Sequence, residues 1–304
     1  MRTFVLTVAA ALSLATNLLL PTSAMAQSTT APYIFVAAPR ENAARGERDY
    51  GPIASFLSHV LHHPVVYEHP NGWLTYETWI WTDHADIYFD GPQFVAWRIN
   101  HLDQTLGPRI PQPQDWRLYT RKGSTIHNLQ QVSTGAILCA PPLPNFGTLW
   151  VMSLFTNPSR QPYIRNTHGW KKIFKDVMDN KCQVGIGPRL TLHYLSSTNN
   201  EIKVFKRSVH YPNQGFSISA ALPLAVRTAI VQALLSPEGE QAMMRLRKRF
   251  AHGRELVLGG ITQYAGIEKS LDAQWGTVYA TGINRDLKQD AKRENLTNVH
   301  LIKP

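Results

Sequence analysis

Hydrophobic and polar positions follow the periods of strand and helix along most of this chain. The β-branched and aromatic run 33–37 predicts a buried strand. After a polar turn, apolar residues recur at helical spacing over 53–61, which predicts a helix with one buried face. We expect that helix to begin at Gly51-Pro52, because proline is tolerated at the first helical position, where the amide has no partner in the helix.

Strand and helix patterns continue to alternate, which predicts an α/β fold. Strands are expected over 65–67, 85–89, 116–120, 136–139 and 182–186, and helices over 73–82, 92–99, 149–155 and 170–178. The segment 108–114 is too rich in proline for regular structure and predicts a crossing between two lobes. Residues 204–205 and 215–218 look like the return crossing. We therefore expect one discontinuous lobe, 27–113 plus 215–304 with a polar tail from about 283, and a second lobe over 114–214.

The N-terminal segment 1–26 has the pattern of an export signal. Arg2 precedes an apolar run over 4–20, and the small residues of Ala-Met-Ala at 24–26 predict cleavage between Ala26 and Gln27. A membrane anchor is the alternative, because the run is nearly long enough to span a bilayer, but Asn17 interrupts its end. No cysteine follows the signal to carry a lipid, so we expect a free periplasmic protein that is not a lipoprotein.

The chain is strongly basic, with a formal net charge of +10. Such a charge suits a nucleic-acid partner, but export removes most partners of that kind, and we expect none. Much of the excess is local, in the expected helix around 245–249 and in the tail over 285–293. For the helix, a solvated basic face is favoured over a docking patch for lipid or an acidic partner.

Cys139 and Cys182 are the only cysteines. An even pair in an oxidising compartment favours a disulfide that closes a long loop. Strand geometry favours two separate buried thiols, because Cys139 ends one expected strand and Cys182 begins another, and neighbouring parallel strands would hold them apart. Both alternatives stay open. No Cys/His spacing matches a zinc site, and we expect no metal.

Two polar turns directly follow apolar strands. Arg40 and Asn42 come after the first strand, and Asp90-Gly91 comes after the strand expected over 85–89. In open α/β sheets, ligands bind at such carboxyl ends of strands. The sequence therefore predicts a binder of small molecules.

Several short motifs occur in an order typical of one family: Pro39-Arg40-Glu41-Asn42, Gly51-Pro52, Val65-Val66-Tyr67, Asp86 to Pro92, Asn213 to Ser217 and Leu234 to Gly239. Together with the export signal, they resemble the phosphate/phosphite/phosphonate substrate-binding proteins of ABC importers, which are type-II periplasmic binding proteins. The resemblance covers about 33–250. It implies two α/β lobes that close over a ligand by a hinge, a monomer without cofactor, and a membrane permease as partner.

The resemblance also suggests a binding turn in the second lobe. Phosphonate binders present a Ser/Thr pair at a helix N-terminus there, where hydroxyls, amides and the helix dipole bind oxyanion oxygens. Here the turn is Asn145-Phe146-Gly147-Thr148. Thr148, the amides of Gly147 and Thr148, and the side-chain amide of Asn145 are the candidates, while the bulky Phe146 indicates a changed pocket.

Two first-lobe tyrosines that contact ligand in the family fall on Trp73 and Asp90. Trp73 keeps an aromatic wall with an N–H donor. A carboxylate at Asp90 would repel a dianion, which favours a monoanionic or zwitterionic ligand. The alternative is that Asp90 caps the helix that begins at Gly91-Pro92.

Other candidate contacts lie at turns expected to face the cleft: Arg40, His168, Arg189, Tyr211 and Gln214. Family members that bind aminoalkyl phosphonates use acidic groups of the second lobe for the amine. The corresponding strand end here, 185–189, has none, and Arg189 favours an anion instead. For His168, a surface role is the simpler interpretation.

A periplasmic hydrolase is the rival from another class. The chain shows neither a G-x-S-x-G elbow nor a paired-carboxylate motif, so we expect no enzyme. A ligand-sensing protein that reports to a membrane kinase is a further alternative, and the sequence does not separate transport from sensing.

Overall fold

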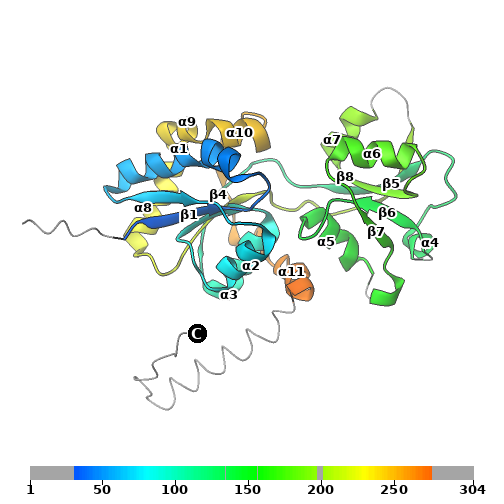
Figure 1. Ribbon diagram of the computed structural model, residues 1–304, viewed down its shortest axis with the longest axis horizontal. Coiled ribbons are helices and arrows are strands. Elements are labelled where there is room, and N and C mark those ends of the chain that lie inside the picture. Colours follow the sequence, from blue (N-terminus) through cyan, green and yellow to red (C-terminus); the bar gives the residue numbers. More distant parts are fainter. Residues whose placement is uncertain (1–30, 134, 156, 197–200, 276–304) are drawn as a thin grey trace, which may run out of the picture. The chain divides into compact units, whose positions relative to one another are not determined.

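The computed structural model describes residues 31–133, 135–155, 157–196 and 201–275 (Figure 1). The expected export signal, its cleavage position and the polar tail lie outside these residues. Within the described part, no helix is long and apolar enough to cross a membrane.

The first sheet has six strands in the order β11-β4-β10-β3-β1-β2. Its strands are β1 (Tyr33–Ala37), β2 (Val65–Glu68), β3 (Ile87–Asp90), β4 (Thr105–Arg109), β10 (Gly215–Ile218) and β11 (Val257–Leu258). β1 runs parallel to β2 and β3, whereas β10 is antiparallel to both β3 and β4. Two separate stretches of chain therefore build one sheet, with the later one contributing a central strand.

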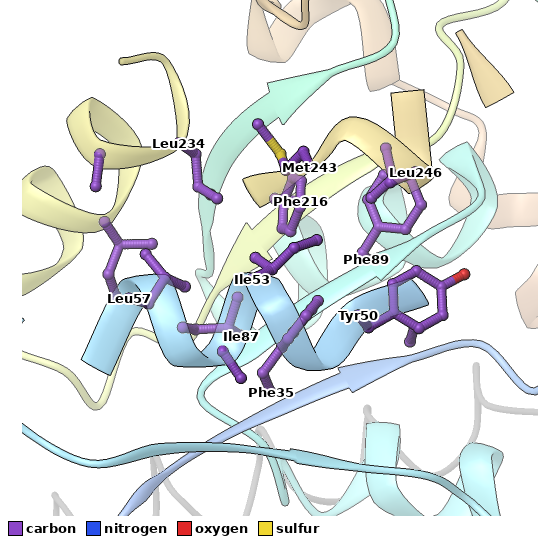
Figure 2. Close-up of a cluster of buried hydrophobic side chains, with 14 of the residues drawn as sticks. Phe35, Tyr50, Ile53, Leu57, Ile87, Phe89, Phe216, Leu234, Met243 and Leu246 are labelled. Carbon is purple, nitrogen blue, oxygen red and sulfur yellow. The ribbon is translucent and has the colours of Figure 1, made fainter. Parts of the chain in front are cut away.

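Helices cover both faces of this sheet: α1 (Ala43–Leu61), α2 (Trp73–Trp81), α3 (Pro92–Leu102), α8 (Leu224–Leu234), α9 (Pro237–Ala242) and α10 (Met244–Phe250). Because side chains alternate along a strand, Phe35 packs with α1 and α8, whereas Val36 packs with α2 and α3. Figure 2 shows the first of these clusters, in which Tyr50, Ile53 and Leu57 of α1 lie against the strand side chains.

Two prolines lie inside regular elements, contrary to expectation. α1 begins at Ala43 rather than at Gly51-Pro52, because the Asn42 side chain caps it by accepting from the Arg45 amide at 3.0 Å. Pro52 itself is exposed, and the buried face of α1 continues on both sides of it, with Tyr50 before it and Ile53 after it. Pro108 lies in β4 at a register shift of the β4–β10 pair, and such bulges tolerate a residue without an amide hydrogen.

The second sheet has the order β7-β6-β8-β5-β9, and all five strands come from residues 116–207. Its strands are β5 (Trp116–Arg121), β6 (Ile137–Ala140), β7 (Tyr163–Asn166), β8 (Val184–Pro188) and β9 (Ile202–Arg207). Its helices are α4 (Leu129–Val132), α5 (Phe146–Ser153), α6 (Trp170–Met178) and α7 (Arg189–Leu195), with a short 3-10 turn, η1 (Pro158–Arg160). The predicted α/β class is confirmed.

The C-terminal part of the described chain connects elements of both sheets. It contains η2 (Ile261–Tyr264) and α11 (Glu268–Trp275), which the sequence patterns did not predict. α11 packs against α3 beside the first sheet and against α5 beside the second. Tyr264 and Ile267 are buried in the same apolar cluster as Phe146 and Trp150 of α5.

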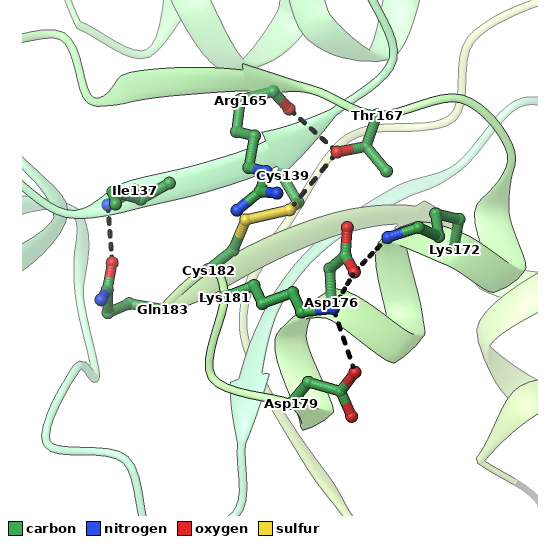
Figure 3. Close-up of a disulfide and its surroundings, with 10 residues drawn as sticks. All are labelled: Ile137, Cys139, Arg165, Thr167, Lys172, Asp176, Asp179, Lys181, Cys182 and Gln183. Carbon is green, nitrogen blue, oxygen red and sulfur yellow. Dashed lines mark hydrogen bonds and ion pairs between the residues drawn. A yellow bond between two sulfur atoms is a disulfide. The ribbon is translucent and has the colours of Figure 1, made fainter.

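A disulfide joins Cys139 and Cys182 (Figure 3), so the expectation of two separate thiols is wrong. β8 begins at Val184, and Cys182 lies in the turn that follows α6 rather than in a strand. Gln183 holds that turn to β6, because its amide donates to the Ile137 carbonyl at 3.0 Å. The two cysteine Cα atoms are consequently only 5.7 Å apart, within reach of a disulfide.

The basic helix α10 is less solvated than its sequence indicated. Arg247 donates to the carbonyls of Gly253 and Arg254 at 2.8 and 3.0 Å, which closes the end of the helix. Arg249 pairs with Glu41 at 2.7 Å and thereby joins α10 to the turn before α1. Two of the basic side chains of this helix, Arg247 and Arg249, are therefore held by contacts within the protein.

Candidate ligand-binding site

The turn before α5 is tied together by its own side chains. Asn145 is the N-cap, and its Oδ1 accepts from the Gly147 amide at 3.0 Å. The Thr148 hydroxyl is buried and donates to the Pro141 carbonyl at 2.6 Å. Among the described residues, the backbone amides of Phe146 and Thr148 have no acceptor. Free amides at a helix N-terminus attract anions, so these are the donors the turn offers.

Gly147 is required by close packing in this turn. A Cβ atom there would lie 2.9 Å from two ring carbons of Trp116, which belongs to β5. The indole of Trp116 therefore packs directly against the backbone of the turn, and only glycine allows this close approach.

Trp73 lies beside the same turn, on the other sheet's helices. It is the first residue of α2 and stacks on Phe94 of α3, with ring centroids 6.0 Å apart. Trp73, Leu143 and Pro144 line a groove of about 330 Å³. The groove is completed by Leu74, Glu77, Gln274 and Trp275. Partial burial raises the pKa of the Glu77 carboxyl above its usual range.

Gln93 is a site residue that the sequence reasoning missed. It lies in the first turn of α3 and is only 3% exposed. Its Nε2 donates to the Pro144 carbonyl at 2.9 Å, while its Oε1 has no partner within the part of the chain that the structure describes. This hydrogen bond brings the first turn of α3 next to the turn before α5, and α3 begins after Gly91 without a side-chain cap. A glutamine directly after Gly91-Pro92 was the available signal.

Asp90 is fully buried in an internal network. Its Oδ1 accepts from Arg98 Nη2 at 2.8 Å, and its Oδ2 accepts from the Tyr76 hydroxyl. Burial alone would lower the pKa of Arg98, but the charge of Asp90 outweighs it and raises that pKa. Asp90 caps no helix, because the N-cap of α3 is Gly91. The charge that was expected to face a ligand is thus compensated inside the first lobe.

Arg40 has a hydrogen-bond donor without an acceptor among the described residues. Its guanidinium lies 5.6 Å from the ring centroid of Phe250, and its buried Nη1 has no partner among the described residues. It lies next to the Glu41–Arg249 pair, at the carboxyl end of β1.

Arg189 and His168 are not held at the α5 turn by any described contact. Arg189 Nε lies 3.3 Å from Asp115 Oδ2, which also faces His210 at 3.3 Å, and Arg117 donates to both oxygens of that carboxylate. Arg189 therefore shares one carboxylate with Arg117, and its charge is only partly compensated. His168 is exposed.

Tyr211 and Gln214 lie in the return crossing. The Tyr211 ring packs edge-on against Phe146 at 4.9 Å, and its burial raises the pKa of the phenol. Gln214 Oε1 is buried without a partner in the described part of the chain. The predicted candidates that gather around the α5 turn are therefore Trp73, Asn145, Gly147, Thr148 and Tyr211.

The described residues contain no cluster of His, Cys, Asp or Glu that could hold a metal ion.

The sequence profile of the family of ABC transporter, phosphonate, periplasmic substrate-binding proteins matches residues 35–275. The chain belongs to this family. The comparison with curated proteins finds no match.

Solved structures show the same fold at low identity. XAC2383 from Xanthomonas citri bound to ATP superposes with a TM-score of 0.60 at 10% identity, covering 80% of this chain and 99% of that one. PhnD1 from Prochlorococcus marinus in complex with methylphosphonate gives 0.57 at 11% identity, covering 80% and 98%. A binding protein component of an ABC phosphonate transporter from Pseudomonas aeruginosa gives 0.55 at 12% identity, covering 87% and 95%.

These findings confirm the predicted family and the two-lobed fold of a type-II periplasmic binding protein. The chain is a periplasmic substrate-binding protein of the phosphonate ABC-transporter type. This family comprises binding proteins rather than enzymes, and its members serve a membrane permease with a small-molecule ligand.

Proposed function

We propose that this phosphonate-family protein binds its oxyanion at the N-terminus of α5, with Trp73 as the facing wall. The observation that carries the proposal is the pair of free amides at Phe146 and Thr148, beside a groove that the Trp73 side chain lines. Two amides and the helix dipole together stabilise a negative charge without any lysine or arginine.

The ligand in this proposal has one negative charge, or is a zwitterion. Asp90 is neutralised by Arg98, whereas Glu77 lines the groove, and among the described residues that line it there is no cation. A second negative charge on the ligand would therefore be repelled at neutral pH. Methylphosphonate and ATP, named with two of the similar structures, both carry tetrahedral phosphorus oxyanions.

Uptake through an ABC importer is the favoured role, with sensing as the alternative. The proposal includes a monomer without catalytic activity, released into the periplasm by cleavage after Ala26 and without a lipid anchor. Arg40, Asp90, His168, Arg189 and Gln214 stay predicted contacts, and of these Arg40 has the free donor.

The test removes one amide at the start of α5. Phe146→Pro lacks the N–H, whereas Phe146→Ala keeps it, and both lose the ring. Proline suits this first helical position, and Asn145 already has the extended backbone that precedes proline, with φ −59° and ψ 131°.

Methylphosphonate is titrated into both variants by calorimetry. We expect the proline variant to bind about 10- to 100-fold more weakly than the alanine variant, the effect of a lost hydrogen bond to a charged group. Equal affinities would show that this amide does not contact the oxyanion.

A further inference from the structure

A second groove lies along α5. It has a volume of about 440 Å³ and lies between α5 and α11. Gln274 lines both grooves. Phe146 joins the head-group turn to the second groove, because its amide is free at the helix start and its ring lines the groove wall.

The α5 wall of this second groove is mainly apolar, with Ser153 as its polar residue. Phe146, Leu149 and Trp150 are spaced three and four residues apart and so share one helix face. Tyr211 and Ile267 extend this apolar lining. A volume of several hundred cubic ångströms with mainly apolar walls is typical of sites for organic ligands and far exceeds what a bare oxyanion fills.

The opposite wall comes from α11 and is more polar. Lys269, Ser270 and Gln274 line it together with Ala273. No carboxylate is among the residues that line the second groove in the described chain, and Lys269 is the charged one. An ammonium group would therefore find no anionic partner there, whereas burial of an uncharged apolar group is favourable.

We propose that the second groove holds an apolar organic substituent of the oxyanion ligand. The ligand is then an alkyl- or arylphosphonate with a substituent of several carbons, not phosphate or an aminoalkylphosphonate. The inference rests on the proposed function, since the phosphonate head must bind at the start of α5 for its substituent to run along that helix.

The first experiment is a chain-length series with the mature protein. Calorimetry compares methyl-, butyl- and hexylphosphonate. Each methylene that is buried should tighten binding about fourfold, so that three to five buried methylenes give a ratio of roughly 60 to 1000 between hexyl- and methylphosphonate.

The outcomes separate the two proposals. Measurable binding of methylphosphonate with a hexyl-to-methyl ratio near one would overturn the substituent groove and leave the oxyanion site standing. Failure of all three compounds to bind would overturn the proposed function, and this inference with it.

A matched pair of variants locates the effect. Ala273 is exposed on α11 at the groove, and Ala273→Phe should fill the groove and reduce the hexyl-to-methyl ratio at least tenfold. Ala225 is exposed on α8 and lines neither groove, so Ala225→Phe should keep the ratio of the unaltered protein. An unchanged ratio in Ala273→Phe would place the alkyl chain elsewhere.

Discussion

Arg98 Nη2 lies 2.8 Å from Asp90 Oδ1, and neither side chain is exposed. The guanidinium also lies 4.1 Å from the Tyr88 ring centroid, and its Nε donates to Ser217 Oγ at 2.8 Å. The end of β3, the strand before α3, is thereby joined to α3 and β10. Asp90, whose position resembles a ligand contact of the family, is thus paired inside the protein.

The first prediction concerns this pair. Arg98→Met should lower the free energy of unfolding by about 3–5 kcal/mol, because it leaves the Asp90 carboxylate buried without its partner. The double variant Arg98→Met/Asp90→Leu should recover a substantial part of the loss. Urea unfolding of Arg98→Met, Asp90→Leu and the double variant gives the three free energies of unfolding. If the effects of the two single changes simply add up in the double variant, direct coupling of the pair is contradicted.

The second prediction concerns the disulfide. Cys139 and Cys182 are 43 residues apart, and closing a loop of this length in the unfolded chain corresponds to about 4 kcal/mol in the chain-entropy treatment. The double variant Cys139→Ala/Cys182→Ala should lose roughly that amount in urea unfolding. A reducing agent should then have no further effect on the variant, while it destabilises the unaltered protein.

The third prediction concerns acid stability. The hydrogen bond from Lys172 lowers the pKa of Asp176 below its usual range, so the native state holds the carboxylate more tightly ionised than the unfolded chain does. The stabilisation is present above the unfolded pKa and is lost as pH falls through the lower native value. Asp176→Asn should cost about 1 kcal/mol at pH 7.

The free energy of unfolding, measured at several pH values, checks the direction of this pH dependence. The difference between Asp176→Asn and the unaltered protein should shrink below about pH 4. Asp179→Asn serves as the control, because the Asp179 side chain is 35% exposed while that of Asp176 is 2% exposed, and exposed pairs contribute little. A difference for Asp176→Asn that grows on acidification would contradict the assignment.

The fourth prediction concerns ligand charge. Glu77 lines the groove with Trp73, so Glu77→Gln should tighten binding of methylphosphonate about fivefold at neutral pH, the effect of roughly 1 kcal/mol of repulsion at 4 Å in water. Glu238→Gln, on the exposed start of α9, should not alter the affinity. Weaker binding by Glu77→Gln would show that the carboxylate contacts a donor on the ligand.

Short-range patterns predicted the elements well where burial alone decides them. The helix Trp170–Met178 has the predicted bounds, because its apolar and charged residues separate cleanly onto two faces. The start of α1 was wrong, since the capping hydrogen bond of Asn42 and the buried Tyr50 outweigh the breaking tendency of Pro52. The predicted lobe boundaries near residues 113 and 214 stay a prediction.

The site was harder to predict, because tertiary packing rather than sequence spacing decides which residues its polar groups pair with. No sequence pattern around Asp90 predicts that its carboxylate will accept hydrogen bonds from Arg98 and Tyr76. Cys182 meets Cys139 only because the chain turns after α6. The contribution of Gln274 to both grooves depends on the position of α11, a short helix with weak periodicity.

The central place of β10 in the first sheet has a consequence for folding. All strands of the second sheet lie between β4 and β10 in the sequence, yet β10 separates β3 from β4. Until β10 is in place, a growing or refolding chain exposes the unpaired edges of β3 and β4. Completing this sheet requires closure of a very long loop, so the final step of folding should be slow, and the preceding intermediate is the species most prone to aggregate.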